Sequence, residues 1–364
     1  MYLLFLCPFW EKTHESWEKD ITEVKKDMMN YEMFRGVIET ELTNFLPESL
    51  GEVEVVIEKV NKVNRELDAV TIKRETDGKQ ISPTIYLQDM YERYEACDSL
   101  PDVMREIADA ITKGMEKSAD ILAKVDIKNA DERIIFQLIN AEQNQKLLEG
   151  VPYRPFQDLA IIYRVVVDET PDAVASAIIT NEMAEYMGKS EAELFELAAE
   201  NTKRINPVKI CGMFETLKMT FASQDMPDEL IESMLPPMPE DELMYVISNQ
   251  RNVNGAISMI YEDSLHELAE KLGEDLYILP SSVHEVLAIP ASTGEPEQLA
   301  EMVYEINMAQ VSLEDRLSNQ VYHYDRKERK LEMATDTPNK RIDGQVAEQS
   351  LVYAQDKKTD APKR

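Results

Sequence analysis

Glycine is so widely spaced along this chain that several common nucleotide-binding and hydrolase motifs are excluded in their usual forms. The 364 residues include eleven glycines, and the two closest, Gly36 and Gly51, lie 15 positions apart. The dinucleotide fingerprint GxGxxG, the phosphate-binding loop GxxxxGKS/T and the nucleophile elbow GxSxG each need two glycines within a few residues of one another. The sequence therefore predicts no bound cofactor.

The first patterned segment predicts an N-terminal lobe over residues 29–122. Apolar residues recur at three- and four-residue steps from Met29 until Pro47, as on one face of a helix. Three β-rich runs follow at 53–60, 67–73 and 83–87. A second helix begins near Ser99, with Pro101 tolerated in its first turn. We expect helices packed on a small antiparallel sheet.

The following segment predicts a larger lobe over 128–334, in which hairpins precede helices. Strand-like runs lie at 159–167, 175–180, 243–248 and 255–260. The first pair precedes a helix opening with Ser190-x-x-Glu193, and the second pair precedes one opening with Ser264-x-x-Glu267. Both spacings are typical of a capping box. Residue identity between the two sets is weak, so the pattern indicates either a structural duplication or chance similarity.

Further elements complete the larger lobe. They are strands at 275–280 and 284–290, a helix from near Pro296 with Leu299, Met302, Val303 and Ile306 facing inward, and a hairpin at 321–333. The predicted fold class is α+β, with a small antiparallel-sheet lobe followed by a larger lobe of hairpin-plus-helix units.

The two ends of the chain differ from its middle. Residues 1–28 open with the apolar run MYLLFLCPFW, which is far shorter than the ~20 residues of a spanning helix. We expect an extension with a start codon assigned too early, the natural start being Met28 or Met29; a membrane-dipping arm is the alternative. Residues 335–364 have no periodic apolar pattern and predict a flexible tail.

Charge and cysteine content bear on partners and compartment. The chain has 39 Lys and Arg against 70 Asp and Glu, a net charge of −31, so nucleic acid and anionic membranes are disfavoured. We expect a protein partner, no nucleic acid and no membrane. Cys7, Cys97 and Cys211 are too far apart for a CxxC pair, which favours a reduced, cytoplasmic protein.

A metal site is not predicted. The segment HELAE at 266–270 resembles the zinc motif HExxH, but Glu270 stands where the second histidine is needed. Glu267 is already explained by the predicted capping box.

The densest cluster of reactive side chains is PSSVHE at 280–285, with Ser281, Ser282, His284 and Glu285 between apolar runs. Serine favours turns, so a turn joining two strands is one interpretation. The other is a ligand-binding or hydrolytic site, joined in space by Asn249 or Asn181. A site requires His284 to be partly buried beside a carboxylate, whereas a turn leaves it solvated.

Four segments carry a family resemblance. SPTIYLQDMYERYEACDSL, FQDLAIIYRVVV, MGKSEAELFELAAENTKRINP and LGEDLYILPSSVHEVLAIP, in this order, resemble the bacterial family called domain of unknown function 5688. The resemblance runs from Met29 to about Met333, and MNYEMF at 29–34 looks like the family's opening. LAEKLGEDLYILPSS and the closing YHYD hairpin make the second lobe more loosely similar to the domain of unknown function 1444 family. Neither resemblance implies a catalytic residue, cofactor or substrate.

Three functions follow as hypotheses. The first is a non-enzymatic cytoplasmic binding or interaction protein, which an exposed apolar patch would favour. The second is a hydrolase-like enzyme centred on 280–285, which a pocket with converging buried polar groups would favour. The third is an acidic mimic of nucleic acid, which a continuous acidic face would favour.

Overall fold

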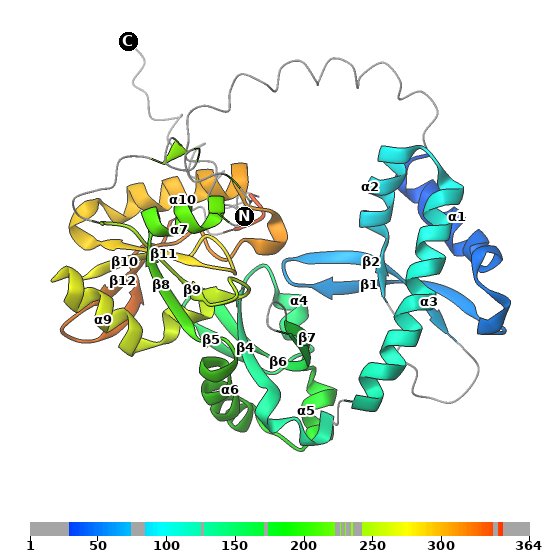
Figure 1. Ribbon diagram of the computed structural model, residues 1–364, viewed down its shortest axis with the longest axis horizontal. Coiled ribbons are helices and arrows are strands. Elements are labelled where there is room, and N and C mark those ends of the chain that lie inside the picture. Colours follow the sequence, from blue (N-terminus) through cyan, green and yellow to red (C-terminus); the bar gives the residue numbers. More distant parts are fainter. Residues whose placement is uncertain are drawn as a thin grey trace, which may run out of the picture. The chain divides into compact units, whose positions relative to one another are not determined.

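The computed structural model describes residues 29–73, 84–124, 127–170, 174–222, 242–337 and 341–344, and the single positions 226, 230, 234 and 235 (Figure 1). The predictions for residues 1–28 and 345–364 lie outside these ranges. The chain divides into two compact units at the junction of residues 126 and 127. No helix in the described ranges is both long and apolar enough to cross a membrane.

The smaller unit packs three helices against a three-stranded antiparallel sheet. Its main elements are α1 Tyr31–Glu41, β1 Glu54–Lys62, β2 Arg65–Lys73, β3 Ile85–Tyr86, α2 Leu87–Cys97 and α3 Leu100–Lys124, with short 3-10 helices at Leu42–Phe45 and Glu48–Leu50. Asn30 caps α1, because its side chain accepts a 2.9 Å hydrogen bond from the Met33 N–H. Phe34 and Ile38, one turn apart on α1, are fully buried in the core.

The larger unit begins with a four-stranded antiparallel sheet around β6 Leu159–Glu169. Its other strands are β4 Ile134–Asn140, β5 Tyr153–Phe156 and β7 Val174–Ile178. Arg164 pairs with both Ile135 of β4 and Ile178 of β7, so β4 lies on one side of β6 and β7 on the other. The helices here are α4 Gln145–Leu148, α5 Asn181–Met187 and α6 Glu191–Ile205, with 3-10 helices at Ile127–Asn129 and Asp131–Arg133. The β6–β7 hairpin was predicted, whereas β4 and β5 were not.

A six-stranded antiparallel sheet completes the larger unit, in the order β13-β12-β10-β11-β9-β8. Its strands are β8 Val208–Gly212, β9 Tyr245–Asn249, β10 Leu276–Leu279, β11 Val286–Pro290, β12 Tyr322–Asp325 and β13 Lys330–Met333. Its helices are α7 Met213–Ala222, α9 Glu262–Leu272 and α10 Pro296–Gln310, with 3-10 helices η6 Gly255–Ile260, η7 Ala291–Thr293 and η8 Leu313–Asp315.

The two sheets of the larger unit share one core. Alternate residues of β10 point to opposite faces: Leu276 and Ile278 face the core shared with the four-stranded sheet, while Leu279 packs with Val303 of α10. In Figure 1, α10 runs across the six-stranded sheet. The α+β class is therefore confirmed.

The predicted second hairpin is wrong. Residues 255–260 form the 3-10 helix η6, and β9 pairs with β8 and β11 instead. A Cβ on Gly255 would lie 2.5 Å from the His284 carbonyl oxygen and 2.7 Å from the Asn249 nitrogen. This close backbone approach, which pattern reasoning does not register, holds η6 against two neighbouring segments. The predicted duplication therefore loses one of its two hairpins.

Only one of the two predicted capping boxes exists. The Ser190 N–H donates to Glu193 Oε2 at 2.8 Å, and the Glu193 N–H donates to Ser190 Oγ at 3.4 Å. By contrast, α9 begins at Glu262 after Tyr261, whose side chain forms no cap, so Ser264 lies inside the helix.

Three smaller predictions also need correction. The strand expected at 83–87 is reduced to β3, because α2 begins at Leu87. Met302, expected to face inward, is 39% exposed, and the buried face of α10 is formed by Ala300, Val303 and Asn307. The flexible tail expected from 335 is wrong for Thr335, which is buried, and for Ile342, which is fully buried.

Candidate functional site

The segment 280–285 joins β10 to β11 and lies along residues 315–318. The Val283 N–H donates to the Asp315 carbonyl at 2.8 Å, and the Leu317 N–H donates to the Ser281 carbonyl at 3.1 Å. Ser282 forms an isolated antiparallel bridge with Arg316. The segment is thus a connection between strands whose main chain is fixed by a second, irregular segment.

His284 lies beside a carboxylate, as the site hypothesis requires. Its side chain is 26% exposed, and Nε2 lies 3.1 Å from Oδ1 of Asp315, whose side chain is 19% exposed. However, Nδ1 accepts a 3.2 Å hydrogen bond from the Asn254 N–H, so the ring proton of the neutral imidazole is on Nε2 and is donated to Asp315. Ser282 Oγ accepts from the His284 backbone N–H at 3.0 Å. Both ring nitrogens are engaged, and this geometry gives no support to a serine–histidine relay.

Asn249 joins this cluster through the loop that follows β9. Its side chain is fully buried, donates to the Val253 carbonyl at 2.8 Å and accepts from the Arg251 N–H at 3.0 Å. These two hydrogen bonds fix the loop in which the Asn254 N–H contacts His284. Asn181 lies elsewhere, at the start of α5, where its side chain donates to the Glu149 carbonyl.

The cluster continues into the four-stranded sheet. Gln137 of β4 donates to Asn254 Oδ1 at 3.2 Å and accepts from Arg164 of β6 at 3.0 Å. Burial lowers the pKa of Arg164. Burial also raises the pKa of the Glu285 carboxyl, an effect that the nearby His284 partly offsets. Of the residues singled out from the sequence, His284 is therefore linked to the four-stranded sheet through Asn254 and Gln137.

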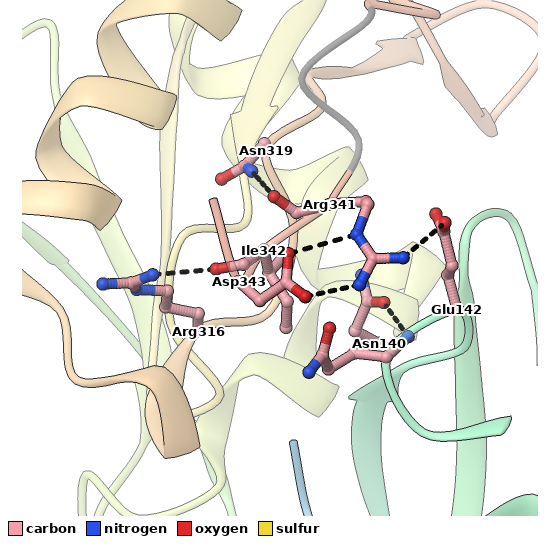
Figure 2. Close-up of polar contacts among 8 residues, drawn as sticks. Asn140, Glu142, Arg316, Asn319, Arg341, Ile342 and Asp343 are labelled. Carbon is pink, nitrogen blue, oxygen red and sulfur yellow. Dashed lines mark hydrogen bonds and ion pairs between the residues drawn. The ribbon is translucent and has the colours of Figure 1, made fainter. Parts of the chain in front are cut away.

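A second polar cluster, which sequence reasoning missed, holds residues 341–344 (Figure 2). Arg316 Nη1 donates to the Ile342 carbonyl at 2.8 Å, and Asn319 Nδ2 donates to the Arg341 carbonyl at 3.0 Å. The Gly344 N–H points back to the Arg341 carbonyl at 3.4 Å, so the four residues form a turn. Ile342 is fully buried at its centre. A guanidinium and an amide thus recognise consecutive main-chain carbonyls.

The charges around the turn are balanced. Arg341 donates through Nε to Asp343 Oδ1 at 3.1 Å, and this hydrogen bond raises the pKa of Arg341. Arg341 Nη1 also lies 3.8 Å from Glu142 Oε1. Burial lowers the pKa of Arg316, while the charge of Asp343 opposes the shift. In Figure 2 the turn lies between Arg316 and Glu142.

Met308 of α10 completes the surroundings of the turn. Its sulfur lies 3.4 Å from Arg316 Nη1. Gly344 has a φ of +78°, and a Cβ there would lie 2.8 Å from the same sulfur. We call Glu142, Met308, Arg316 and Asn319 the turn receptor.

Buried polar residues next to the turn receptor fix its position through hydrogen bonds. Asn307 of α10 is fully buried and donates to the Ser318 carbonyl at 3.0 Å and to Asn319 Oδ1 at 2.7 Å. Its own Oδ1 has no hydrogen-bond partner in the described part of the chain. Gln320 accepts from Thr335 Oγ1 at 2.7 Å. The sequence carries no local signal for this cluster, because the polar residues at 318–320 stand among other polar and charged residues.

A hollow of about 640 Å³ borders the turn receptor. Its ten lining residues lie between Ala141 and Leu159 and include Glu142, Glu149 and Asp158. Asp158 is held by Ser318 Oγ at 2.6 Å and by the hydroxyl of the buried Tyr322. We call this feature the acidic hollow; it shares Glu142 with the turn receptor.

The described ranges contain no candidate metal site, because no group of three or more His, Cys, Asp and Glu side chains there is arranged to hold an ion. His266 and Glu270 of the HELAE segment lie on α9, and His266 Nδ1 is buried without a partner in those ranges. The absence of zinc stays a prediction.

Comparison with known proteins gives one family match. A model described as a family of unknown function (DUF5688) matches residues 31–326. No curated protein and no solved structure matches the chain. The looser resemblance of the second lobe to the domain of unknown function 1444 family is not shown by this match. The turn receptor lies inside the matched range, whereas residues 341–344 lie beyond it.

Proposed function

Because the chain belongs to DUF5688, a family of unknown function, its role has to be argued from its own geometry, and we propose a non-enzymatic interaction protein whose larger unit binds a short peptide turn. The observation that carries this proposal is the seating of residues 341–344 on the turn receptor. Arg316 and Asn319 bind main-chain carbonyls and Ile342 is fully buried.

This arrangement has the chemistry of a peptide-binding site. Hydrogen bonds to main-chain carbonyls can be made to any polypeptide, while a buried side chain adds selectivity. Burial of an isoleucine side chain stabilises by about 1.5–3 kcal/mol, and a hydrogen bond from a charged donor by about 1.5–3 kcal/mol. The loss of translational and rotational freedom on association offsets much of this gain, so we expect a separate four-residue segment to bind weakly.

We also propose that the protein works in a bacterial cytoplasm. Cys97 and Cys211 are free thiols, and a reduced compartment keeps them so. The hydrolase alternative lacks a free base at His284, and the acidic-mimic alternative rests on net charge alone.

The test opens the turn receptor in the full chain and adds the turn as a separate peptide. Ile342→Asp places a charge where the buried anchor sits and should release the turn. A fluorescein-labelled peptide PNKRIDG, the sequence of 338–344, should then bind to this variant at least tenfold more tightly than to the parent, as measured by fluorescence anisotropy. Circular dichroism confirms folding.

Two controls make the result specific. The peptide with Asp in place of Ile should not bind, and Gly344→Val, which is incompatible with a φ of +78°, opens the receptor by a different route. Absence of peptide binding to both folded variants would refute the proposed function.

A further inference from the structure

We propose that the partner of the turn receptor is a basic polypeptide segment, in which Lys or Arg residues flank the branched apolar anchor and lie in the acidic hollow. This inference rests on the proposed function and names the chemistry of its partner.

The acidic hollow and the turn receptor are continuous. Glu142 lines the hollow and also lies 3.8 Å from Arg341 of the seated turn. Asp158 lines the hollow and accepts a hydrogen bond from Ser318, the neighbour of Asn319. A chain that places its turn on Arg316 and Asn319 therefore has its flanking residues at the edge of the hollow.

The charge of the hollow selects basic residues. Glu142, Glu149 and Asp158 are among its ten lining residues, and none of the ten is Lys or Arg. The side chain of Glu142 is 46% exposed, so it is accessible to a partner. The electrostatic attraction between such exposed groups is modest and depends on salt.

The apolar part of the hollow fits the same side chains. Leu148, Pro155 and Leu159 line it, as does Tyr153, which is 40% exposed. Lys and Arg bury their aliphatic stems on apolar surface while their charged ends stay near carboxylates or water. A tyrosine ring adds a favourable face for a cation. The volume of about 640 Å³ lies within the usual range of binding pockets.

The turn seated in the structure begins with a cation, Arg341, directly before the anchor Ile342. In the sequence a second cation, Lys340, precedes Arg341. Arg341 of this pair already contacts Glu142.

The experiment compares two peptides on the full-length Ile342→Asp chain. The labelled peptide PNKRIDG is set against PNQQIDG, which keeps the anchor and the turn but lacks both cations. We expect the basic peptide to bind about tenfold more tightly at 50 mM NaCl, because two exposed ion pairs together contribute about one tenfold step in affinity. Higher salt should reduce the difference.

A charge-matched pair of variants locates the effect. Glu142→Gln with Glu149→Gln should abolish the preference for the basic peptide. Glu196→Gln with Glu200→Gln, which removes the same charge from exposed positions of α6, should leave it unchanged.

The outcomes separate the two proposals. If neither peptide binds, the proposed function fails. If both peptides bind equally and the Glu142 and Glu149 variant has no effect, the turn receptor stands and the basic partner is refuted. If both pairs of variants reduce the preference equally, the general acidity of the protein is responsible and the hollow is refuted as the site.

Discussion

At the scale of single residues, Asn307 shows how one buried amide holds the turn receptor in shape. Its Nδ2 donates both to the main chain at Ser318 and to the side chain of Asn319, which in turn donates to the seated turn. Asn319 is therefore oriented by a residue that does not touch the turn.

We predict that Asn307→Asp destabilises the larger unit by about 3 kcal/mol, because a carboxylate cannot donate to these two acceptors and would be a buried, unpaired charge. Urea unfolding measures the effect. Gln310→Glu, which adds the same charge at the exposed end of α10, should stay within about 0.5 kcal/mol of the parent. Equal losses in the two variants would contradict the role assigned to Asn307.

Glu285 gives a prediction about pH. Burial raises the pKa of its carboxyl in the folded chain, with His284 lowering and Asp315 raising it to smaller extents. The folded state therefore holds this proton more tightly than the unfolded state, and stability is lost as pH rises from the unfolded pKa through the folded pKa.

We predict that Glu285→Gln unfolds at a higher temperature than the parent at pH 7, and that this difference shrinks as the pH falls toward 4. Thermal denaturation followed by circular dichroism between pH 4 and 8 measures it. The exposed substitution Glu196→Gln is the control; a gain for Glu285→Gln that is the same at every pH would argue against a raised pKa for Glu285.

At the scale of elements, the sequence predicted features that depend on neighbouring residues better than features that depend on contacts between distant segments. The capping box at Ser190 lies within four residues and was predicted correctly, whereas the same spacing at Ser264 gave a false one because α9 begins at Glu262. Residues 255–260 read as a strand because their apolar content is local, whereas the contact of Gly255 with the backbone of Asn249 and His284 depends on the tertiary fold.

The candidate site divides in the same way. Residue type singled out Ser282, His284 and Asn249, and these residues do lie around one loop. Their hydrogen bonds fix the main chain of that loop and engage both ring nitrogens of His284. The turn receptor was missed because Arg316 and Asn319 bind partners more than 20 positions away. No local spacing records such pairs.

The two Ser-x-x-Glu segments give a matched test at this scale. Ser190→Ala removes a real cap and should cost about 1 kcal/mol, or roughly 2–4 °C in the unfolding midpoint of a unit of this size. Ser264→Ala removes nothing from the start of α9 and should change stability by less than about 0.5 kcal/mol. Differential scanning calorimetry measures both; similar losses would mean that Ser264 caps its helix after all.

At the scale of the whole molecule, the division of the chain at residues 126 and 127 predicts separate folding of two domains. The smaller unit has its own core around Phe34 and Ile38, and the larger unit has a core that spans two sheets. We propose that residues 29–122 are the folded body of the smaller domain, and that residues 128–334 are that of the larger domain together with the buried Thr335 and Ile342.

We predict two calorimetric transitions for the full chain, and we expect the fragment 127–364 to unfold within about 3 °C of one of them, since a change of 1 kcal/mol shifts the midpoint by about that much. The fragment is compared with the intact chain in the same buffer. A single transition that is lost in the fragment would show one cooperative body.

Because the turn occupies the receptor of its own chain, a separate partner must exceed a minimum affinity in order to displace it. Thr337, whose N–H is held by Gln320 at 3.2 Å, is followed by three residues before Arg341, so the turn is tethered close to the receptor. A short tether gives a local concentration on the order of millimolar. A partner present at micromolar concentration must therefore bind about a thousandfold more tightly than the turn does in order to occupy half of the receptors. The protein thereby ignores abundant weak competitors and responds only to a partner that adds contacts beyond the turn.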